Sequence, residues 1–311
     1  MKSGTDINTE LDEKYVNLKI EGKLAFIQFS NPKKRNALSS RLCREMSGAI
    51  RRCMQIKIPV IIIAAGEKDK VWSSGLDISE FYETAEEPNG SQIQKQNIPG
   101  QTGKKIPAQD KKTGCNMSLG QKKKKLRDPV AEDCPLPLLL KEIEDYPGIV
   151  IAMIHGSVWG GAAELVAACD LAYGDMTASF AVTPAKIGLP YSCKGLLRFI
   201  NKTGIAIAKE LFYTAAPVSA MRAKETGLIN WLAENSDFSE LKNLTFEKAN
   251  SIAKLSPAIL KSLKEEFRLF ERKEFSEKDI LVFSKIRNIA FESGDFEKGV
   301  KAFLSKTVPD F

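Results

Sequence analysis

The sequence has one histidine, His155, and six cysteines in 311 residues, and no two cysteines form a C-x-x-C pair. A zinc or other transition-metal site needs several such ligands at short spacing, so no metal site is expected. Scattered cysteines in a chain of this length are typical of reduced thiols that pack as small apolar residues. A single histidine without a catalytic partner nearby also favours a structural role for His155.

Long apolar runs are absent as well. None approaches the roughly 20 residues that a membrane-spanning helix needs, and runs such as Ile58–Ala65 have the length of a strand. The polar and acidic start, Met1–Asp12, resembles neither a secretory signal nor an arginine-rich transit peptide. These features predict a cytoplasmic protein with a flexible N-terminus, residues 1–12, and no membrane partner.

The net charge of +7 is concentrated in one segment. Residues 88–127 carry ten basic side chains and one acidic side chain, a charge of +9, which leaves −2 for the rest of the chain. The segment is rich in Gly, Pro, Gln, Asn and Lys and has few large apolar residues. It cannot bury enough apolar surface to offset the entropy lost on ordering. We therefore predict that 88–127 is a basic, disordered insertion.

One stretch combines a strand, a glycine turn and a helix start. The run Ile149–Ile154 is typical of a short buried strand, and Gly160-Gly161 then precede Ala, Glu and Leu, which are good helix formers. Glycine lets a ligand approach the backbone closely. The helix start presents unpaired N–H groups and the positive end of the helix dipole. The stretch therefore predicts a site that stabilises a developing negative charge on oxygen.

Strands alternate with helices over the first 190 residues, and helices follow, which predicts an α/β protein. A second glycine turn, Ser73–Ile78, also follows a strand. The predicted strands are 15–20, 24–29, 60–65, 149–154, 171–174 and 179–182. The predicted helices start at Ser39 or Ser40 and cover 136–143, the segment up to 169, 205–214, 220–226, 238–255, 257–270, 277–292 and 296–305.

Five segments that occur in order resemble the enoyl-CoA hydratase/isomerase (crotonase) superfamily: 31–38, 73–78, 155–164, 183–191 and 293–311. The resemblance implies an α/β fold in which a spiral of ββα units is followed by a C-terminal helical region. It places the spiral core at 13–200, interrupted by 88–127, and a helical trimerisation region at 201–311. It also implies a homotrimer or a hexamer.

The resemblance implies an oxyanion hole for a coenzyme A thioester. Its two backbone N–H donors fall at Leu76 and Gly161. The nearest subfamily usually has a histidine at the position of Leu76. Because the donor is the backbone N–H, leucine keeps the oxyanion hole but lacks a polar side chain for any further role. Further positions match residues that bind the substrate and its coenzyme A portion: Ser74, Gly75, Leu76, Asp77, Ile78, Gly161, Thr183, Lys33, Arg35 and Lys306.

The acid and base residues choose between reactions. The hydratases of the superfamily use two glutamates, and this chain has the first, Glu164, but has Ala185 at the second position. Water addition needs acid–base help, whereas decarboxylation needs less. Tyr191 matches a tyrosine near the substrate carboxylate, and Gly156–Ala162 resembles the methylmalonyl-CoA decarboxylases. We therefore predict a carboxy-lyase that converts methylmalonyl-CoA, or a close malonyl homologue, to propionyl-CoA and CO2. It would need neither metal nor cofactor, since coenzyme A is part of the substrate.

Other interpretations remain open. Glu164 could serve an enoyl-CoA hydratase or isomerase, or could merely complement the helix dipole, and Tyr191 could be a packing residue. The chain could also bind coenzyme A or another polyanion without turnover. The insertion 88–127 could be a tolerated loop, an attraction for the anionic substrate or an RNA-binding segment. Because the run Lys122–Lys125 lacks interleaved aromatic residues, recognition of nucleic acid by stacking is not expected.

Overall fold

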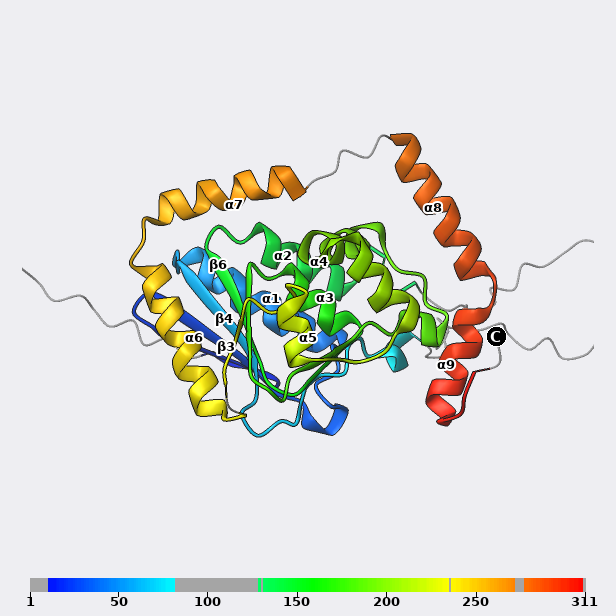
Figure 1. Cartoon of the computed structure of the whole chain (residues 1–311), viewed down its shortest axis with the longest axis horizontal. Helices are drawn as coiled ribbons and strands as arrows, with labels where there is room; N and C mark the ends of the chain where they lie inside the picture. Colours follow the sequence, from blue (N-terminus) through cyan, green and yellow to red (C-terminus); the bar gives the residue numbers. More distant parts are fainter. Residues whose placement is uncertain (1–10, 82–127, 130, 235, 272–276, 310–311) are drawn as a thin grey trace, which may run out of the picture.

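The computed structural model describes residues 11–81, 128–129, 131–234, 236–271 and 277–309 (Figure 1). The predicted insertion 88–127, with Cys115, lies outside the described residues. Of the other cysteines, Cys193 is half-buried and the remaining four are buried, and none of the five forms a disulfide with another described residue. In the described parts of the chain, no helix is both long enough and apolar enough to cross a membrane.

A seven-stranded sheet forms the centre of the molecule. The predicted hairpin is present as an antiparallel pair, and the strands that follow it in the sheet are parallel. In spatial order the strands are β1 (Leu11–Asp12), β2 (Val16–Glu21), β3 (Leu24–Phe29), β4 (Val60–Ala65), β6 (Ile149–Ile154), β8 (Leu171–Gly174) and β11 (Trp231–Leu232).

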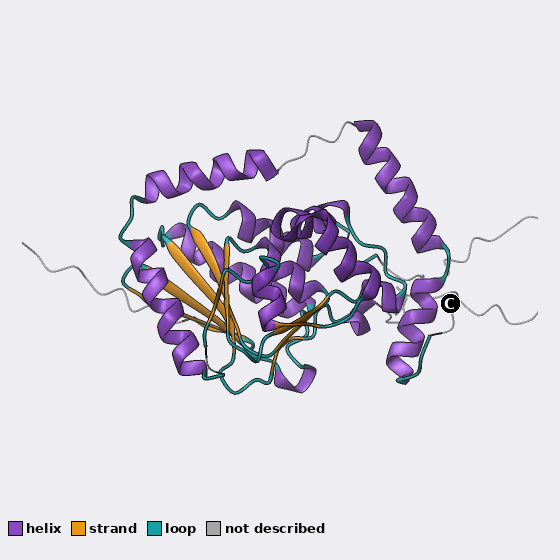
Figure 2. Cartoon of the chain, viewed as in Figure 1, coloured by secondary structure: helices purple, strands orange, loops and turns teal. Residues whose placement is uncertain are grey.

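The central strands are buried on both faces. Alternate residues of β4 point to two separate apolar clusters, with Ile61 and Ile63 in one and Val60 and Ile62 in the other. Helices on both faces explain why β4 reads as a continuous apolar run rather than an alternating one. Figure 2 shows helices on either side of the strands, and α6 (Phe238–Ala253) covers one of the two faces.

A second sheet of four short strands lies next to the first. It consists of β10 (Val218–Ser219), β9 (Ser179–Ala181), β7 (Ser157–Trp159) and β5 (Val71–Ser73), in that order. The sequence did not predict β7, because three residues between glycines are too few to show a period. This strand pairs in parallel with β5 and with β9. The loops that follow β5 and β7 therefore begin at the same edge of the sheet.

The helices agree with the predicted ones except at one start. Ser39 caps α1 by accepting a hydrogen bond from the Leu42 N–H, as expected. The helix predicted from 205 is present, but a further helical segment precedes it in α4. That segment begins at Cys193 and is capped by Ser192, and the two segments meet at a kink where Gly204 has non-helical angles, φ +75° and ψ +160°. The remaining helices are α1 (Ser40–Gln55), α2 (Pro135–Asp145), α3 (Gly161–Ala168), α4 (Cys193–Thr214), α5 (Ala220–Glu225), α7 (Pro257–Glu271), α8 (Glu277–Glu292) and α9 (Asp295–Ser305), with short 3-10 turns at Pro32–Lys34, Ile78–Phe81 and Pro184–Ile187.

The boundaries expected from sequence differ from the structure at both ends of the core. Residues Leu11 and Asp12, assigned to a flexible N-terminus, pair with β2. The boundary at residue 200 falls inside α4, and β11 from the predicted helical region pairs with β8. Both segments supply backbone hydrogen bonds that the edges of the main sheet would otherwise lack. The sheet core therefore extends beyond 13–200.

The C-terminal helices form an arm around the core. In Figure 1, α7 runs along the top of the molecule and α8 lies at its outer edge. The last helix, α9, returns to the core and packs against the 3-10 turn Pro184–Ile187. The contact is close, because a Cβ on Gly299 would lie 2.2 Å from the Ile187 carbonyl oxygen.

Candidate active site

Two glycine turns meet where β5 and β7 end. The parallel register Ser73↔Val158 brings the loop after β5 against the start of α3. Gly75 has φ +89°, and a Cβ there would lie 2.4 Å from the Trp159 carbonyl oxygen and 3.1 Å from the Gly161 nitrogen. A side chain at Gly75 would be both strained and in collision. This glycine is therefore what allows the two turns to approach.

The approach leaves two backbone amides side by side. Gly161 is the first residue of α3, so its N–H has no partner within the helix. A Cβ built on Gly161 would lie 3.5 Å from the Leu76 nitrogen. Within the described ranges, neither the Leu76 N–H nor the Gly161 N–H donates a hydrogen bond. The two donors that the sequence predicts are thus adjacent and free, although their use as an oxyanion hole stays a prediction.

Backbone hydrogen bonds hold the loop that carries Leu76. The Ser74 N–H donates to the Arg35 carbonyl at 3.0 Å, and the Leu38 N–H donates to the Gly75 carbonyl at 2.7 Å. On the other side of Leu76, the Asp77 N–H donates to the Leu38 carbonyl at 3.3 Å. These bonds join residues 35–38 to 74–77 and fix the direction of the Leu76 amide.

An ion pair at the same loop involves one of the predicted binding residues. Lys34 Nζ lies 2.7 Å from Asp77 Oδ2. Burial acts in the opposite direction, yet hydrogen bonds from Lys34 and Ser79 hold the pKa of Asp77 below its usual value. The hydrogen bond to Asp77 raises the pKa of Lys34 in turn. Asp77 is thus occupied in stabilising the loop, while Lys33 and Arg35 have exposed side chains.

The buried carboxylate of the site belongs to Glu164 in the first turn of α3. Arg198 Nη1 lies 2.6 Å from Glu164 Oε1. The same guanidinium donates from Nε and Nη2 to both carboxylate oxygens of Glu144, at 2.6 and 2.9 Å. Burial raises the pKa of Glu164, and the charge of Arg198 opposes that shift. The two glutamates keep the pKa of Arg198 above its usual value, although burial alone would lower it.

Tyr191 lies beside Glu164 in an aromatic wall. Its ring makes edge contacts with Phe212, at a centroid distance of 4.8 Å, and with Phe199, at 6.3 Å. A Cβ on Gly195 would lie 2.4 Å from Tyr191 Cε1 and 2.8 Å from Glu164 Oε1, so this glycine leaves room for both side chains.

The Tyr191 hydroxyl is buried next to the Glu164 carboxylate, with which it interacts, but it makes no hydrogen bond of standard geometry with any residue that the structure describes. Burial, and then the charge of Glu164, raise the pKa of Tyr191 well above its usual value. The hydroxyl is therefore a neutral group that can donate a hydrogen bond. Because a buried hydroxyl without a well-formed hydrogen bond is unfavourable, it is suited to meet a polar group of a ligand.

The remaining predicted residues lie at the edges of this region. Thr183 Oγ1 would be 3.6 Å from a Cβ on Gly160, which places Thr183 at the glycine turn. Lys306 is exposed at the C-terminal cap of α9. The structure thus brings together Leu76, Gly161, Thr183, Glu164 and Tyr191. Lys33, Arg35 and Lys306 remain exposed cations at the surface.

Sequence reasoning missed Arg198. Its signal is weak but present, because Arg198 is a lone charge within the apolar run Leu196–Ile200. It follows Gly195 by three residues and therefore lies on the same side of α4. A buried arginine at such a position needs an acidic partner, and Glu164 was the available candidate.

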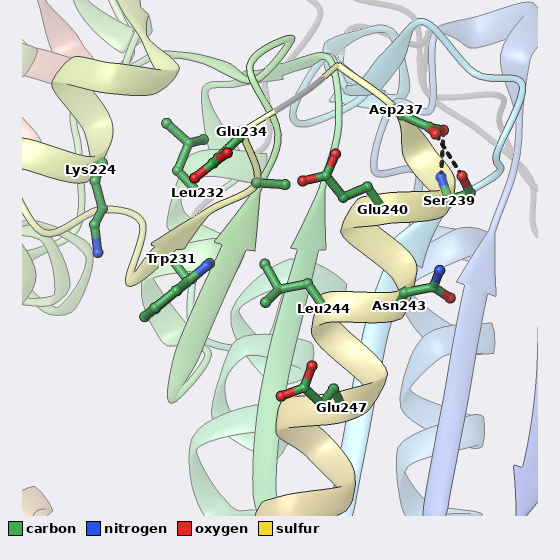
Figure 3. A pocket seen from close by; sticks show the side chains of 11 residues that line it. Lys224, Trp231, Leu232, Glu234, Asp237, Ser239, Glu240, Asn243, Leu244 and Glu247 are labelled. Atoms are coloured by element: carbon green, nitrogen blue, oxygen red, sulfur yellow. Dashed lines mark hydrogen bonds between the residues drawn. The ribbon is translucent and has the colours of Figure 1, made fainter.

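A separate cavity of about 680 Å³ lies between β11 and the first half of α6 (Figure 3). Trp231 and several acidic side chains, including Glu234 and Glu247, line it. None of the residues of the two glycine turns takes part in it. Neither in this cavity nor elsewhere do the described residues contain a group of three or more His, Cys, Asp or Glu side chains that could hold a metal ion.

Comparison with known proteins identifies relatives over nearly the whole chain. The family model described as enoyl-CoA hydratase/isomerase matches residues 19–101 and 114–311. It leaves 102–113 unmatched, a narrower stretch than the predicted insertion 88–127. A protein of Escherichia coli (strain K12) named methylmalonyl-CoA decarboxylase is 30% identical over 298 residues, which are 96% of this chain and 97% of the relative.

Other relatives carry different names. A probable enoyl-CoA hydratase of Bacillus subtilis (strain 168) is 28% identical over a stretch that covers 95% of this chain and 98% of the relative. A solved structure of methylmalonyl-CoA decarboxylase in complex with 2-nitronate-propionyl-CoA superposes with a TM-score of 0.79. It is 29% identical, and the superposition covers 96% of this chain and 99% of that one. Fold and sequence therefore point to the same group of proteins.

Proposed function

Because the chain belongs to the enoyl-CoA hydratase/isomerase family, we propose that it decarboxylates a malonyl-type coenzyme A thioester. The proposed substrate is methylmalonyl-CoA or a close malonyl homologue, and the products are propionyl-CoA and CO2. The observation that carries the proposal is the combination of two amides that donate no hydrogen bond within the described residues with the buried Tyr191 hydroxyl, which makes no hydrogen bond of standard geometry there. Ala185, where the hydratases have a second glutamate, removes the group that water addition would need.

The proposed reaction begins with the thioester carbonyl between the amides of Leu76 and Gly161. The bond between Cα and the carboxylate carbon breaks, CO2 leaves, and the electron pair moves through the enolate to the thioester oxygen. Two aligned N–H donors stabilise that charge by about 3 kcal/mol each, and the dipole of α3 acts in the same direction. A proton taken up from solution at Cα completes propionyl-CoA. The step requires neither a metal nor a cofactor.

Tyr191 is proposed to orient the substrate carboxylate. Its hydroxyl can donate to one carboxylate oxygen and hold the breaking bond perpendicular to the thioester plane. The neighbouring rings of Phe199 and Phe212 give the carboxylate an apolar environment. Such an environment disfavours the charged ground state relative to the neutral product CO2. A tyrosine in an aromatic wall therefore suits decarboxylation better than it suits hydration.

The relatives support this choice without deciding it. The decarboxylase of Escherichia coli reaches 30% identity, and one solved decarboxylase contains a carboxypropyl coenzyme A ligand at 29% identity. The probable hydratase of Bacillus subtilis reaches 28%. Because these identities are so similar, the proposal depends on Tyr191 and Ala185 rather than on the ranking of the relatives.

The test is to incubate the protein separately with methylmalonyl-CoA and with crotonyl-CoA and to follow the products by mass. We expect propionyl-CoA and CO2 from the first and no hydration of the second. Hydration of crotonyl-CoA with no CO2 from methylmalonyl-CoA would overturn the proposal. It would support the second candidate, a hydratase or isomerase that uses Glu164. One observation favours that candidate. Burial raises the pKa of Glu164, as a carboxyl group that donates a proton requires. Binding of propionyl-CoA without any turnover would instead identify a protein that only binds coenzyme A.

We also propose that the chain associates with further copies of itself as a homotrimer or hexamer. On α7, the apolar side chains at 259, 263, 267 and 270 recur at helical spacing and are all exposed. Phe267 is 63% exposed and Phe270 is 85% exposed. An exposed apolar stripe of this kind marks an interaction surface. A second copy of the chain is the proposed occupant, since the stripe belongs to a helix that runs along the outside of the core (Figure 1).

A further inference from the structure

Arg198 is a buried arginine that joins three helices through two carboxylates. Its guanidinium donates from Nε and Nη2 to the two carboxylate oxygens of Glu144 on α2. The remaining nitrogen, Nη1, donates to Glu164 on α3. The side chains of Arg198 and Glu164 are both almost fully buried. Bidentate arginine–carboxylate contacts are strong and directional. The guanidinium therefore has one fixed position, and Glu164 Oε1 is held at 2.6 Å from it.

This contact restrains Glu164, the buried carboxylate that follows the Gly161 amide in the first turn of α3. The groups that face Glu164 are Arg198 from α4, Tyr191 from the loop before α4 and the more distant Glu144 from α2. Arg198 favours the ionised carboxylate, whereas burial and Glu144 favour the protonated form. With Arg198 present, Glu164 is a weaker base than its burial alone would make it. Its Oε1 is also committed to a strong hydrogen bond that a proton transfer would have to break.

We propose that Arg198 is a positioning residue that withholds Glu164 from proton transfer at the substrate Cα, so that the enolate forms by loss of CO2 rather than by loss of a proton. This inference rests on the proposed function, because it assumes a thioester enolate at the amides of Leu76 and Gly161. It makes Arg198 a determinant of reaction specificity. On this proposal, the hydrogen bond from Arg198, and not the position of Glu164 in the site, prevents Glu164 from acting as a catalytic base.

If Glu164 is released from Arg198, the reaction to test is exchange of the proton on the substrate Cα. The freed carboxylate would take the Cα proton of a saturated acyl-CoA. The C–H bond breaks, an O–H bond forms on Glu164, and the electron pair moves to the thioester oxygen. In D2O the carboxyl group exchanges its proton for deuterium and returns deuterium to Cα. Propionyl-CoA is the probe, because it has no carboxylate to lose and reports proton transfer alone.

The experiment measures the incorporation of deuterium into propionyl-CoA by mass for the wild type and for Arg198→Met. Acid–base catalysis contributes about 10²–10⁴-fold when the group is well placed, and we expect Arg198→Met to raise the exchange rate by at least about tenfold. The midpoint of its pH profile should lie above that of the wild type, because the ionised carboxylate has lost its cation. The double variant Arg198→Met/Glu164→Gln should return to the wild-type rate.

Two control variants separate the proposal from a general loosening of the fold. Glu144→Gln removes the other partner of Arg198 but keeps the contact with Glu164. Lys194→Met, on the same helix as Arg198, removes an exposed ion pair between Lys194 and Glu132. Lys194→Met should exchange at the wild-type rate, and Glu144→Gln, which keeps Arg198 in contact with Glu164, should not show the tenfold gain of Arg198→Met. Circular dichroism and thermal unfolding establish that each variant is folded, and Arg198→Gln replaces Arg198→Met if the latter is not.

Exchange at the wild-type rate in a folded Arg198 variant would overturn the proposal. So would a faster exchange that persists in the Glu164→Gln background, or an equal gain in Glu144→Gln. The outcome is separate from that of the proposed function. Failure of the wild type to release CO2 from methylmalonyl-CoA would overturn the decarboxylase alone, whereas the exchange assay needs only the two amides and Glu164.

Discussion

Single side-chain atoms determine whether the amides of Leu76 and Gly161 can serve a ligand. At Gly161 the added Cβ of alanine would lie 2.8 Å from Leu136 Cδ2 and 3.5 Å from the Leu76 nitrogen. It would therefore add an apolar atom within contact distance of the Leu76 donor. The backbone at Gly161 is helical and lies outside the positive-φ region, so alanine is compatible with the fold there.

Gly161→Ala should therefore lower kcat for the proposed decarboxylation by about 10²-fold, the cost of losing one oxyanion donor. Its thermal unfolding temperature should fall only modestly, because the one contact below 3.0 Å is with the end of the Leu136 side chain, which has to shift slightly. The control is Gly48→Ala on α1, where a Cβ would meet nothing within 4 Å and should stabilise the helix by about 1 kcal/mol. Steady-state kinetics and thermal melts measure both effects. An active Gly161→Ala enzyme would contradict the assignment of the donors.

The hydroxyl of Tyr191 can be removed without disturbing its ring. In Tyr191→Phe the contacts with Phe199 and Phe212 remain. The change removes a buried oxygen that makes no hydrogen bond of standard geometry with any described residue. A hydrogen bond to a charged group contributes about 1.5–3 kcal/mol, so kcat should fall by roughly 10–100-fold. The affinity for propionyl-CoA, which has no carboxylate to orient, should stay the same.

The comparison is made with Tyr213→Phe on α4, whose ring is exposed. Its kcat and its affinity for propionyl-CoA should both equal those of the wild type. If Tyr191→Phe weakened propionyl-CoA binding as much as it slowed turnover, Tyr191 would be a packing residue instead.

At the scale of elements, one buried lysine attaches α7 to the core. Lys264 is 8% exposed, and its ammonium donates to Asp170 Oδ2 at 2.7 Å and to the Gly148 carbonyl at 3.0 Å. Lys264→Met would leave Asp170 without this cation, although the Val150 N–H still donates to it. Loss of one partner from a buried pair costs about 3–5 kcal/mol, and we expect a loss near the lower end.

The matched change is Lys261→Met, one turn earlier on α7, where the ion pair with Glu265 is exposed. Such a pair contributes about 0.5 kcal/mol or less. Urea unfolding of both variants gives the two free energies. Equal losses for Lys264 and Lys261 would show that the anchor at Asp170 does not hold α7 to the core.

The helices and strands that the sequence predicted are long enough for their repeating pattern of apolar residues to be recognised. The run Val60–Ala65 and the apolar face of α1 reflect burial directly, and Ser39 marks the helix start with its own hydrogen bond. The segment of α4 before Gly204 was missed, although the break that Gly204 suggests is present as a kink between two helical segments. The partner of Glu164 was missed for a different reason. A contact between α3 and α4 depends on how helices pack, and no local spacing encodes that distance.

At the scale of the whole molecule, charge and apolar surface are distributed unevenly. The described core carries the proposed site, the excess positive charge belongs to residues 88–127, and the exposed apolar stripe belongs to α7. If the basic segment binds RNA or another polyanion, the binding should weaken steeply with salt and should be lost when residues 88–127 are deleted. Absence of RNA binding at low salt would contradict that interpretation and leave a tolerated loop or an attraction for the anionic substrate.

The stripe on α7 makes the oligomeric state testable with one substitution. Phe267→Asp places a charge at an exposed position, so a monomer would tolerate it, whereas an apolar interface would pay the cost of burying an unpaired carboxylate. We expect light scattering after size exclusion to show a trimer or hexamer for the wild type and a smaller species for Phe267→Asp. Met54→Asp, on the exposed side of α1, introduces the same charge outside the stripe and should leave the mass unchanged. A wild-type monomer would refute the proposed assembly, and an unchanged mass in Phe267→Asp would place the interface away from α7. Because α7 is tied to the core through Lys264, Lys264→Met should also weaken association, which links the anchor of the arm to the assembly that the arm is proposed to form.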